Sequence, residues 1–162
     1  MNDFVVADLC DQNDDIEIIK PIFQSYGLNK SFSGKIKTVK VHNDNSYIKK
    51  LLENDGDGFI MVVDGGGSLE CALMGDNLAE QACKNNWKGI LINGCIRDSE
   101  IINTLPISIK ALNTCPIKSI KNNKGEYDSN LSFGGVTFIN GNYIYSDSDG
   151  IIISTKDLLQ EN

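Results

Sequence analysis

Two short apolar runs, residues 59–63 and 89–92, constrain the fold of this chain more than any other feature. Strands that are buried on both faces have continuous apolar sequences, and turn residues bound them. Both runs are short, and glycines lie close to both of them, which favours a strand over a buried helix. We therefore expect each run to form a buried strand, with residues 59–63 in a central position in the sheet.

Each run leads into a glycine-bearing stretch that carries charge. Residues 64–67 read Asp-Gly-Gly-Gly, and residues 93–98 read Asn-Gly-Cys-Ile-Arg-Asp, which we interpret as a turn. Side chains at strand ends converge on a crevice. Arg97 can hold a carboxylate with its planar fork, and Asp98 offers hard oxygens to Mg²⁺ or a similar cation. Taken alone, each motif is more often an exposed ion pair or a plain turn.

A helix is predicted over residues 75–86, with its first turn close to the same place. The first-turn N–H groups of a helix have no partner inside the helix and bind anions. The candidate contacts of a substrate carboxylate are therefore Gly75, Asp76, Asn77 and Leu78. Twenty residues separate Asp76 from the Arg97-Asp98 pair.

The remaining pattern indicates a single domain, residues 1–162, with a mixed sheet. No repeat or linker interrupts the 162 residues, a length that suits one core. Strands without regularly interposed long helices favour a mixed sheet sandwich. A short helix or a turn is expected at 5–10 and a helix at 46–54, and a further helix could begin at residue 14. Further strands are expected at 31–42, 107–112, 117–121, 130–139 (with a bulge at its two glycines), 143–145 and 151–154.

Composition excludes several classes of partner. The net charge of −7 argues against a nucleic-acid ligand, which requires a basic face. No apolar run reaches the length of a membrane span, and the acidic first residues do not form a signal peptide, so a cytoplasmic protein is expected. Five cysteines without a CxxC pair indicate reduced thiols. Neither a Walker loop nor a dinucleotide fingerprint is present.

Several other residues are weighed as functional candidates. Cys95 lies beside the proposed site, but a small packing residue is favoured over a nucleophile. His42, the single histidine, is expected to be a surface residue rather than a general base. Asp147 and Asp149 could hold a second metal, although turn-forming acids are favoured.

Six motifs together carry a family resemblance: Val6-Ala7-Asp8-Leu9-Cys10-Asp11, Val62-Val63-Asp64-Gly65-Gly66-Gly67, Gly75-Asp76-Asn77-Leu78, Gly94-Cys95-Ile96-Arg97-Asp98, Phe133-Gly134-Gly135-Val136-Thr137 and Asp147-Ser148-Asp149-Gly150-Ile151-Ile152-Ile153. The chain resembles the RraA-like family over essentially its whole length. That family includes regulators of ribonuclease E and the divalent-metal pyruvate aldolases. Length and termini are most similar to the regulator branch, whereas the Arg97-Asp98 pair is similar to the catalytic branch.

The resemblance implies a compact α/β/β sandwich of the swivelling-domain type, assembled as a ring-shaped homotrimer with sites at subunit interfaces. It implies cleavage of 4-hydroxy-4-methyl-2-oxoglutarate to pyruvate and decarboxylation of oxaloacetate, both through the pyruvate enolate. Asp98 would be the direct ligand of Mg²⁺ or Mn²⁺, Arg97 would contact the substrate, and Asp76 would order water on the metal. No residue stands out as the general base, and a water on the metal is the default candidate.

Two other functions stay open at this point. The chain could be a non-catalytic regulator that binds and inhibits an endoribonuclease of the ribonuclease E type, and acidic charge suits the basic regions of such an enzyme. It could also be a member with neither activity. Asp98 distinguishes these possibilities, because a pure binding protein has no need of a metal-ligating carboxylate at this position.

Overall fold

The two apolar runs form neighbouring parallel strands inside a large sheet, in a computed structural model that describes residues 3–160. These strands are β4 (Phe59–Asp64) and β6 (Gly89–Ile96), and Met61 lies opposite Ile90 in their register. Every residue of β6 is buried, as a strand covered on both faces requires. Both strand predictions are confirmed, but β6 extends to Ile96, so the expected turn at residues 93–98 begins only at Arg97.

Ten strands make up the main sheet, which is mixed. β3 (Phe32–Lys40), β4, β6 and β7 (Ser108–Thr114) run parallel, and antiparallel strands extend the sheet on both sides. The order is β1-β12-β11-β3-β4-β6-β7-β2. The antiparallel strands are β1 (Glu17–Ile18), β2 (Gln24–Tyr26), β11 (Tyr143–Ser146) and β12 (Ile151–Ser154). Two short strands lie off this path: β5 (Ala72–Met74), which pairs with the end of β6, and β8 (Glu126–Tyr127), which pairs with the end of β3.

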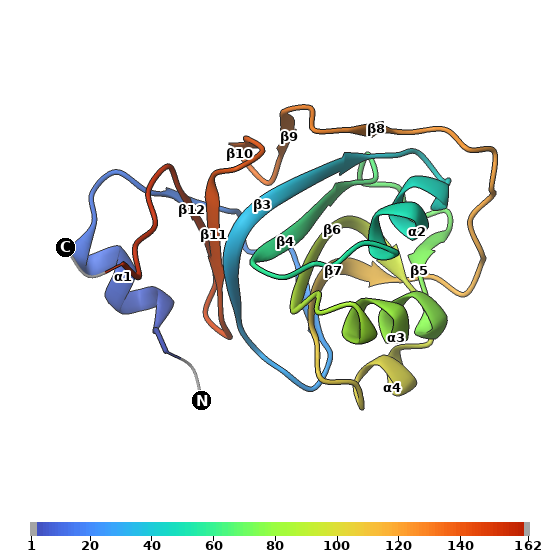
Figure 1. The fold of residues 1–162 in the computed structure, drawn as a ribbon, viewed down its shortest axis with the longest axis horizontal. Coiled ribbons are helices and arrows are strands. Elements are labelled where there is room, and N and C mark those ends of the chain that lie inside the picture. Colours follow the sequence, from blue (N-terminus) through green and yellow to red (C-terminus); the bar gives the residue numbers. More distant parts are fainter. Residues whose placement is uncertain (1–2, 161–162) are drawn as a thin grey trace.

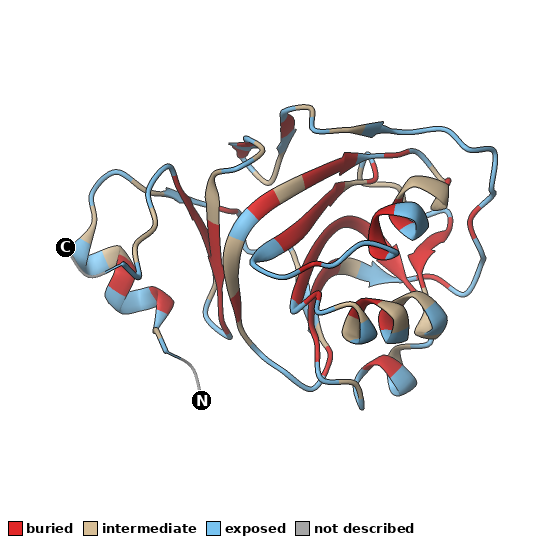
Figure 2. Ribbon diagram, viewed as in Figure 1, coloured by how far each residue is buried: buried red, intermediate tan, exposed pale blue. Residues whose placement is uncertain are grey.

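Three short helices cover one face of the parallel strands: α2 (Ser46–Leu52), α3 (Asp76–Lys84) and α4 (Ser99–Ile102) (Figure 1). Their apolar sides and the sheet form the largest hydrophobic core, which includes Ile48, Ala79 and Ile102. The buried parts of α2 and α3 face the strands, whereas their other sides are exposed (Figure 2). Amphipathic helices therefore hold the sheet in place from this face.

The opposite face has its own core, closed by the hairpin of β9 (Leu131–Phe133) and β10 (Val136–Phe138). Helix α1 (Val6–Gln12) packs separately, against Tyr145 and Ile152 of β11 and β12. The molecule thus has helices, a large mixed sheet and a further β layer. This architecture confirms the expected α/β class and mixed sheet. No helix within residues 3–160 has the length and apolar character needed to cross a membrane.

Three local predictions are wrong. Residues 130–139 form two strands, because Gly134 (φ +62°) and Gly135 (φ +81°) make a tight hairpin turn in place of a bulge. Residues 117–121 form only isolated bridges to β5 and to Asp44. The segment after residue 14 forms strand β1 and not a helix, because its backbone pairs with β12.

Candidate functional site

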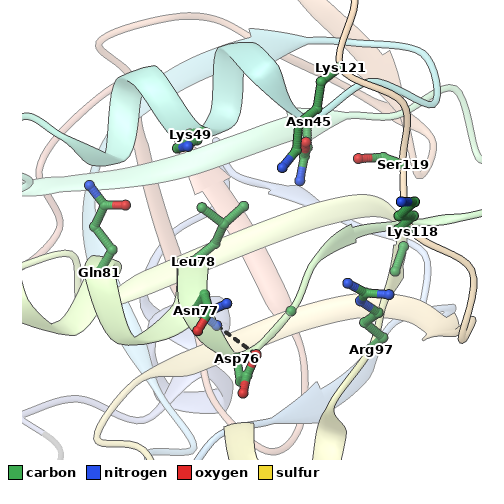
Figure 3. Close-up of a pocket in the computed structure, with 12 residues that line it drawn as sticks. Asn45, Lys49, Asp76, Asn77, Leu78, Gln81, Arg97, Lys118, Ser119 and Lys121 are labelled. Atoms are coloured by element: carbon green, nitrogen blue, oxygen red, sulfur yellow. Dashed lines mark hydrogen bonds between the residues drawn. The ribbon is translucent and has the colours of Figure 1, made fainter.

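A cavity of about 250 Å³ lies between the N-terminal end of α3, the start of α2 and the segment that follows β7 (Figure 3). In Figure 3, Asp76, Asn77 and Arg97 lie at the lower side of the cavity and Lys49, Asn45 and Lys121 at the upper side, while Ser119 and Lys118 lie at the right, with Lys118 just above Arg97. The complete lining is Asn45, Lys49, Ala72, Gly75, Asp76, Asn77, Leu78, Gln81, Arg97, Lys118, Ser119 and Lys121.

Parallel pairing of β5 with β6 brings Gly75 and Arg97 together. The two strands end side by side, with Met74 opposite Ile96, and the Arg97 amide donates to the Met74 carbonyl at 2.9 Å. Each strand leads directly into a helix, α3 after β5 and α4 after β6. Residues that follow neighbouring parallel strands therefore meet at one edge of the sheet, as the sequence motifs predicted.

Asp98 caps helix α3 from outside that helix. Its Oδ2 atom accepts a hydrogen bond from the Asp76 amide at 3.1 Å, and it lies 3.9 Å from Arg97 Nε. Asp98 itself adopts a left-handed conformation (φ +56°), which is uncommon for a residue with a side chain and more frequent for Asp and Asn. Such conformations cluster at functional sites.

Gly75 leaves the space that the Asp98 carboxylate occupies. A Cβ atom at position 75 would lie 2.6 Å from Asp98 Oδ2, well inside van der Waals contact. The φ of Gly75 is −126°, which any residue can adopt, so close approach rather than backbone conformation explains the glycine. The glycine at position 75 therefore makes room for the carboxylate at position 98.

The first turn of α3 retains a free donor. The Asp76 amide bonds to Asp98, and the Asn77 amide bonds to Asp76 Oδ1 at 2.8 Å. The Leu78 amide has no hydrogen-bond partner within residues 3–160. A free N–H at a helix N-terminus beside an arginine is an anion-binding arrangement.

The structure brings most of the sequence-derived site residues together. Five of them line the cavity, namely Gly75, Asp76, Asn77, Leu78 and Arg97. Asp98 is not part of the lining, and it reaches the cavity edge through its contacts with Asp76 and Arg97. The side chains of Arg97 and Asp98 are 42% and 36% exposed, so both are accessible to a ligand.

The Asp64–Gly67 turn does not line this cavity. The Gly65 and Gly67 amides both donate to the Asn93 carbonyl at 3.1 Å, and Asp64 Oδ1 accepts from Asn93 Nδ2 at 3.0 Å. Gly66 and Gly67 both have positive φ, which explains the choice of glycine. The turn therefore fixes the end of β4 against β6, and it supports the site only through that strand.

Sequence reasoning missed seven of the twelve residues that line the cavity, Ala72 and six polar residues. The missed polar residues are Asn45, Lys49, Gln81, Lys118, Ser119 and Lys121. Lysines on exposed segments carry no motif. Within residues 117–121 the interleaving of lysine and apolar residues predicts a strand, not a cavity wall. The cavity lining contains four positively charged side chains and one carboxylate, although the net charge of the whole chain is negative.

Asp44 holds the missed segment in place. This buried carboxylate accepts from the Ser46 amide at 2.8 Å and the Ser46 hydroxyl at 2.6 Å. It also accepts from the Asn122 amide at 2.8 Å and the Lys124 amide at 3.3 Å. Burial alone would raise the pKa of Asp44, but these hydrogen bonds outweigh burial and keep the pKa below its ordinary value. The charged carboxylate thus connects the start of α2 to residues 122–124.

Three other candidates lie outside the cavity. Cys95 is fully buried, and burial raises the pKa of its thiol, which fits a packing residue. His42 is exposed and does not line the cavity. Asp147 accepts from the Val6, Asp149 and Gly150 amides, so it acts as a turn-forming and helix-capping acid.

A divalent cation is compatible with the donor set at Asp98. Within residues 3–160 no three His, Cys, Asp or Glu side chains converge on one point, so a site built entirely from protein side chains is not present. Asp98 Oδ1 has no hydrogen-bond partner in the same range, and Asp76 lies beside it. Mg²⁺ typically takes one or two carboxylates and fills its other positions with water and substrate oxygens.

The fold and cavity define an α/β protein with a large mixed sheet and a positively charged cavity at the ends of two parallel strands. The chain belongs to the RraA-like family, described as Aldolase/RraA, whose match covers residues 6–153. A protein from Aromatoleum aromaticum, provisionally named as a 4-hydroxy-4-methyl-2-oxoglutarate aldolase, is 48% identical over 158 residues. The match covers 97% of this chain and 99% of that protein.

Two solved structures share the fold closely. One is described as an S-adenosylmethionine:2-dimethylmenaquinone methyltransferase from Geobacillus kaustophilus, with a TM-score of 0.95, 47% identity, and coverage of 98% of this chain and 99% of that one. The other is described as the RNA-processing inhibitor RraA from Thermus thermophilis, with a TM-score of 0.92, 37% identity, and coverage of 96% and 94%. These similar chains carry three different functional names, so the choice between the three functions has to rest on the residues of the site.

Proposed function

We propose that this protein is a divalent-metal-dependent pyruvate aldolase that cleaves 4-hydroxy-4-methyl-2-oxoglutarate and also decarboxylates oxaloacetate. The observation that carries the proposal is the position of the Asp98 carboxylate, fixed at the N-terminus of α3 beside Arg97. The provisional name of the Aromatoleum relative supports the same activity. The cavity is smaller than the ~300–1,000 Å³ of pockets for drug-sized ligands, which favours a small acid over a large methyl donor.

Arg97 and the first turn of α3 would bind the 2-oxo acid end of the substrate. The Leu78 amide can donate to the carboxylate, and the Arg97 guanidinium can donate to the carboxylate or the 2-oxo oxygen. Negative charge builds up on the 2-oxo oxygen as the enolate forms. A donor aimed at that oxygen typically contributes about 2.7–4 kcal/mol to the stability of the transition state.

Both reactions deliver an electron pair to carbon 3 of the substrate. In the aldol cleavage, the 4-hydroxyl loses its proton, the bond between carbons 3 and 4 breaks, and carbon 4 becomes the ketone of a second pyruvate. In the decarboxylation of oxaloacetate, the bond to the distal carboxylate breaks and releases CO₂. The resulting pyruvate enolate then takes a proton at carbon 3, so neither reaction needs an oxidant or a reductant.

Asp98 would hold the cation, with Asp76 close enough to orient a water molecule beside it. When bound, a Mg²⁺ or Mn²⁺ ion would supply a Lewis acid that withdraws electrons from the 2-oxo group. Arg97 and Asp98 would keep their mutual placement because both follow β6 directly, a fully buried strand.

A pyruvate-release assay tests the proposal. The purified protein should release pyruvate from 4-hydroxy-4-methyl-2-oxoglutarate and from oxaloacetate in the presence of Mg²⁺ or Mn²⁺. The same metal concentration without protein is the control, because free divalent ions also decarboxylate oxaloacetate. A protein that is no faster than the free ion on either substrate would refute the proposal.

We also propose that the protein works as a homotrimer in the cytoplasm, with the site completed by a neighbouring subunit. The support is family membership and the exposed apolar side chains close to the cavity segments, such as Leu69, Ile117 and Ile120. Light scattering should give three times the chain mass at micromolar concentration. A stable monomer would contradict this assembly.

The second candidate function is inhibition of an endoribonuclease through protein–protein contact. The Thermus structure described as an RNA-processing inhibitor favours it. The acidic net charge would suit basic, RNA-binding regions on such an enzyme. Inhibition of a ribonuclease E-type enzyme by the protein, without any binding to RNA in a gel-shift experiment, would support this function, and it would be compatible with aldolase activity.

A further inference from the structure

The upper and right-hand sides of the cavity in Figure 3, here called the second wall, carry charge that the mechanism above does not use. Lys118 and Lys121 come from the segment after β7, and Lys49 comes from α2. Within residues 3–160 none of these three lysines forms an ion pair or a side-chain hydrogen bond. Unpaired cations gathered at one concave surface attract an anion.

A buried hydroxyl on the same wall has no partner. Ser119 is only 7% exposed, and its Oγ makes no hydrogen bond within residues 3–160. Its side chain points from the 118–121 segment toward the cavity in Figure 3. Buried polar groups are nearly always hydrogen-bonded, and one without a partner destabilises the protein. The Oδ1 atom of Asn45, on the adjoining element, is also buried and unpaired.

The backbone of this wall is fixed in advance. The Ala72 amide donates to the Ile117 carbonyl at 2.7 Å, and the Ile120 amide donates to the Asn43 carbonyl at 2.9 Å. The Asp44 carboxylate holds the residues that follow. Lys118, Ser119 and Lys121 are therefore presented from a segment anchored on both sides, as a preorganised binding site requires.

We propose that Lys118, Ser119 and Lys121 form a second carboxylate subsite, which selects dicarboxylic over monocarboxylic 2-oxo acids. This inference rests on the proposed function for the orientation of the substrate, whose 2-oxo acid end lies on Arg97 and α3. The distal carboxylate then lies against the opposite wall, where the lysines neutralise it and the Ser119 hydroxyl donates to it. The cavity thus binds both carboxylates of the substrate, one on Arg97 and α3 and the other on the lysines of the opposite wall.

The two reactions use this subsite differently. In the aldol cleavage the distal carboxylate stays charged and leaves on the second pyruvate, so the lysines can hold it throughout. In the decarboxylation of oxaloacetate the same carboxylate becomes neutral CO₂, and a cation bound to it stabilises the ground state. Loss of the lysines should therefore reduce aldol cleavage more than decarboxylation.

Binding of two substrate analogues tests the subsite without catalysis. The probes are 2-oxoglutarate, which has a distal carboxylate and no 4-hydroxyl, and 2-oxobutyrate, which has one carboxylate. Calorimetry in the presence of Mg²⁺ should show that the wild-type protein binds 2-oxoglutarate roughly tenfold more tightly or better, as charge-assisted hydrogen bonds predict. The double variant Lys118→Gln, Lys121→Gln should lose that preference, and Ser119→Ala should reduce it.

Lys88→Gln is the matched control. Lys88 is an exposed lysine just before β6, at the opposite end of that strand from Arg97, and its variant removes one charge at a distance from the cavity. Equal affinity of the wild-type protein for both probes, or an unchanged preference in the double variant, would overturn the subsite. A lysine-dependent preference in a protein that releases no pyruvate would instead uphold the subsite and refute the aldolase function.

Discussion

The Oδ2 atom of Asp98 lies 3.1 Å from the backbone nitrogen of Asp76, so a residue in the connection between β6 and α4 caps helix α3. The two sequence motifs that pointed to a site are thus in direct contact. The contact also places one carboxylate where a helix N-terminus favours negative charge. It fixes the candidate metal ligand without burying it, since its side chain is 36% exposed.

Replacement of Asp98 by alanine should abolish metal-dependent pyruvate release, because the variant removes the only carboxylate that would bind the cation directly. EDTA should abolish the activity of the wild-type protein in the same way, and added Mg²⁺ or Mn²⁺ should restore it. His42→Ala is the control and should keep wild-type activity, because His42 lies outside the cavity. Full metal-dependent activity in Asp98→Ala would contradict the assignment.

Arg97→Lys should lower kcat by roughly 100- to 1,000-fold, the usual effect of losing one donor to a developing oxyanion. A lysine keeps the positive charge but cannot reproduce the planar fork of the guanidinium. The thermal unfolding midpoint and the assembly state should not change, because the Arg97 side chain makes only a long contact with Asp98. Steady-state kinetics on oxaloacetate, run beside light scattering, separates the two effects.

Gly75→Ala should reduce activity strongly while it changes stability by at most about 1 kcal/mol. The added Cβ would lie 2.6 Å from Asp98 Oδ2, and the carboxylate can rotate away at little cost. The backbone at Gly75 already has a conformation that alanine adopts. Denaturant unfolding and a pyruvate-release assay on the same preparation test this. Wild-type activity in the variant would show that the placement of Asp98 is not required.

Asp44→Asn should destabilise the protein by about 1–3 kcal/mol, because an amide cannot accept from all the donors that now meet the carboxylate. The N–H groups of Asn122 and Lys124 both point at one oxygen of Asp44. An amide NH₂ at that position would leave them unsatisfied. The free energy of unfolding, measured with urea at pH 7, gives the loss. Asp55→Asn is the control, because Asp55 lies in an exposed turn, where its Oδ1 accepts from the Asp57 amide at 2.9 Å and from Asn86 Nδ2 at 3.4 Å.

The stability that Asp44 contributes should disappear in acid. Its pKa is lower in the folded protein than in the unfolded chain, so the unfolded chain binds more protons as the pH falls through this range. The contribution is therefore complete above the unfolded pKa of about 4 and is lost as the pH falls through the folded value. Urea unfolding at a series of acidic pH values should show the stability difference between wild type and Asp44→Asn shrinking as the pH falls. A difference that stays constant throughout the acid range would show that Asp44 is not the responsible group.

The sequence predicted the wall that the first turn of α3 and the residue after β6 form. The run at β4, the run at β6 and the helix start at Gly75 all have local signals, and parallel pairing then brings Gly75 and Arg97 together. The polar residue Asn93 and the glycine after it made β6 look shorter than it is, because a buried asparagine held by Asp64 and the adjoining turn cannot be recognised locally.

The other wall could not be predicted for a different physical reason. Lys118 and Lys121 border the cavity only because backbone contacts with Asp44 and Ala72 hold their segment there, and these two residues lie far away in the sequence. An exposed lysine has the same local pattern whether it borders a cavity or open solvent. The hairpin at Gly134-Gly135 was missed because a bulge and a two-residue turn both use glycine at positive φ.

The hydrogen bond between Asp44 and the Asn122 amide joins positions that are 78 residues apart in the chain. Closing a loop of that length costs conformational entropy that local contacts do not repay, so this bond should form late in folding, after β4, β6 and β7 have paired. A partly folded molecule could thus have a complete sheet and an intact Arg97–Asp98 edge, yet no second wall. Formation of the complete cavity would then mark the last step of folding, whereas formation of the sheet would mark an earlier one.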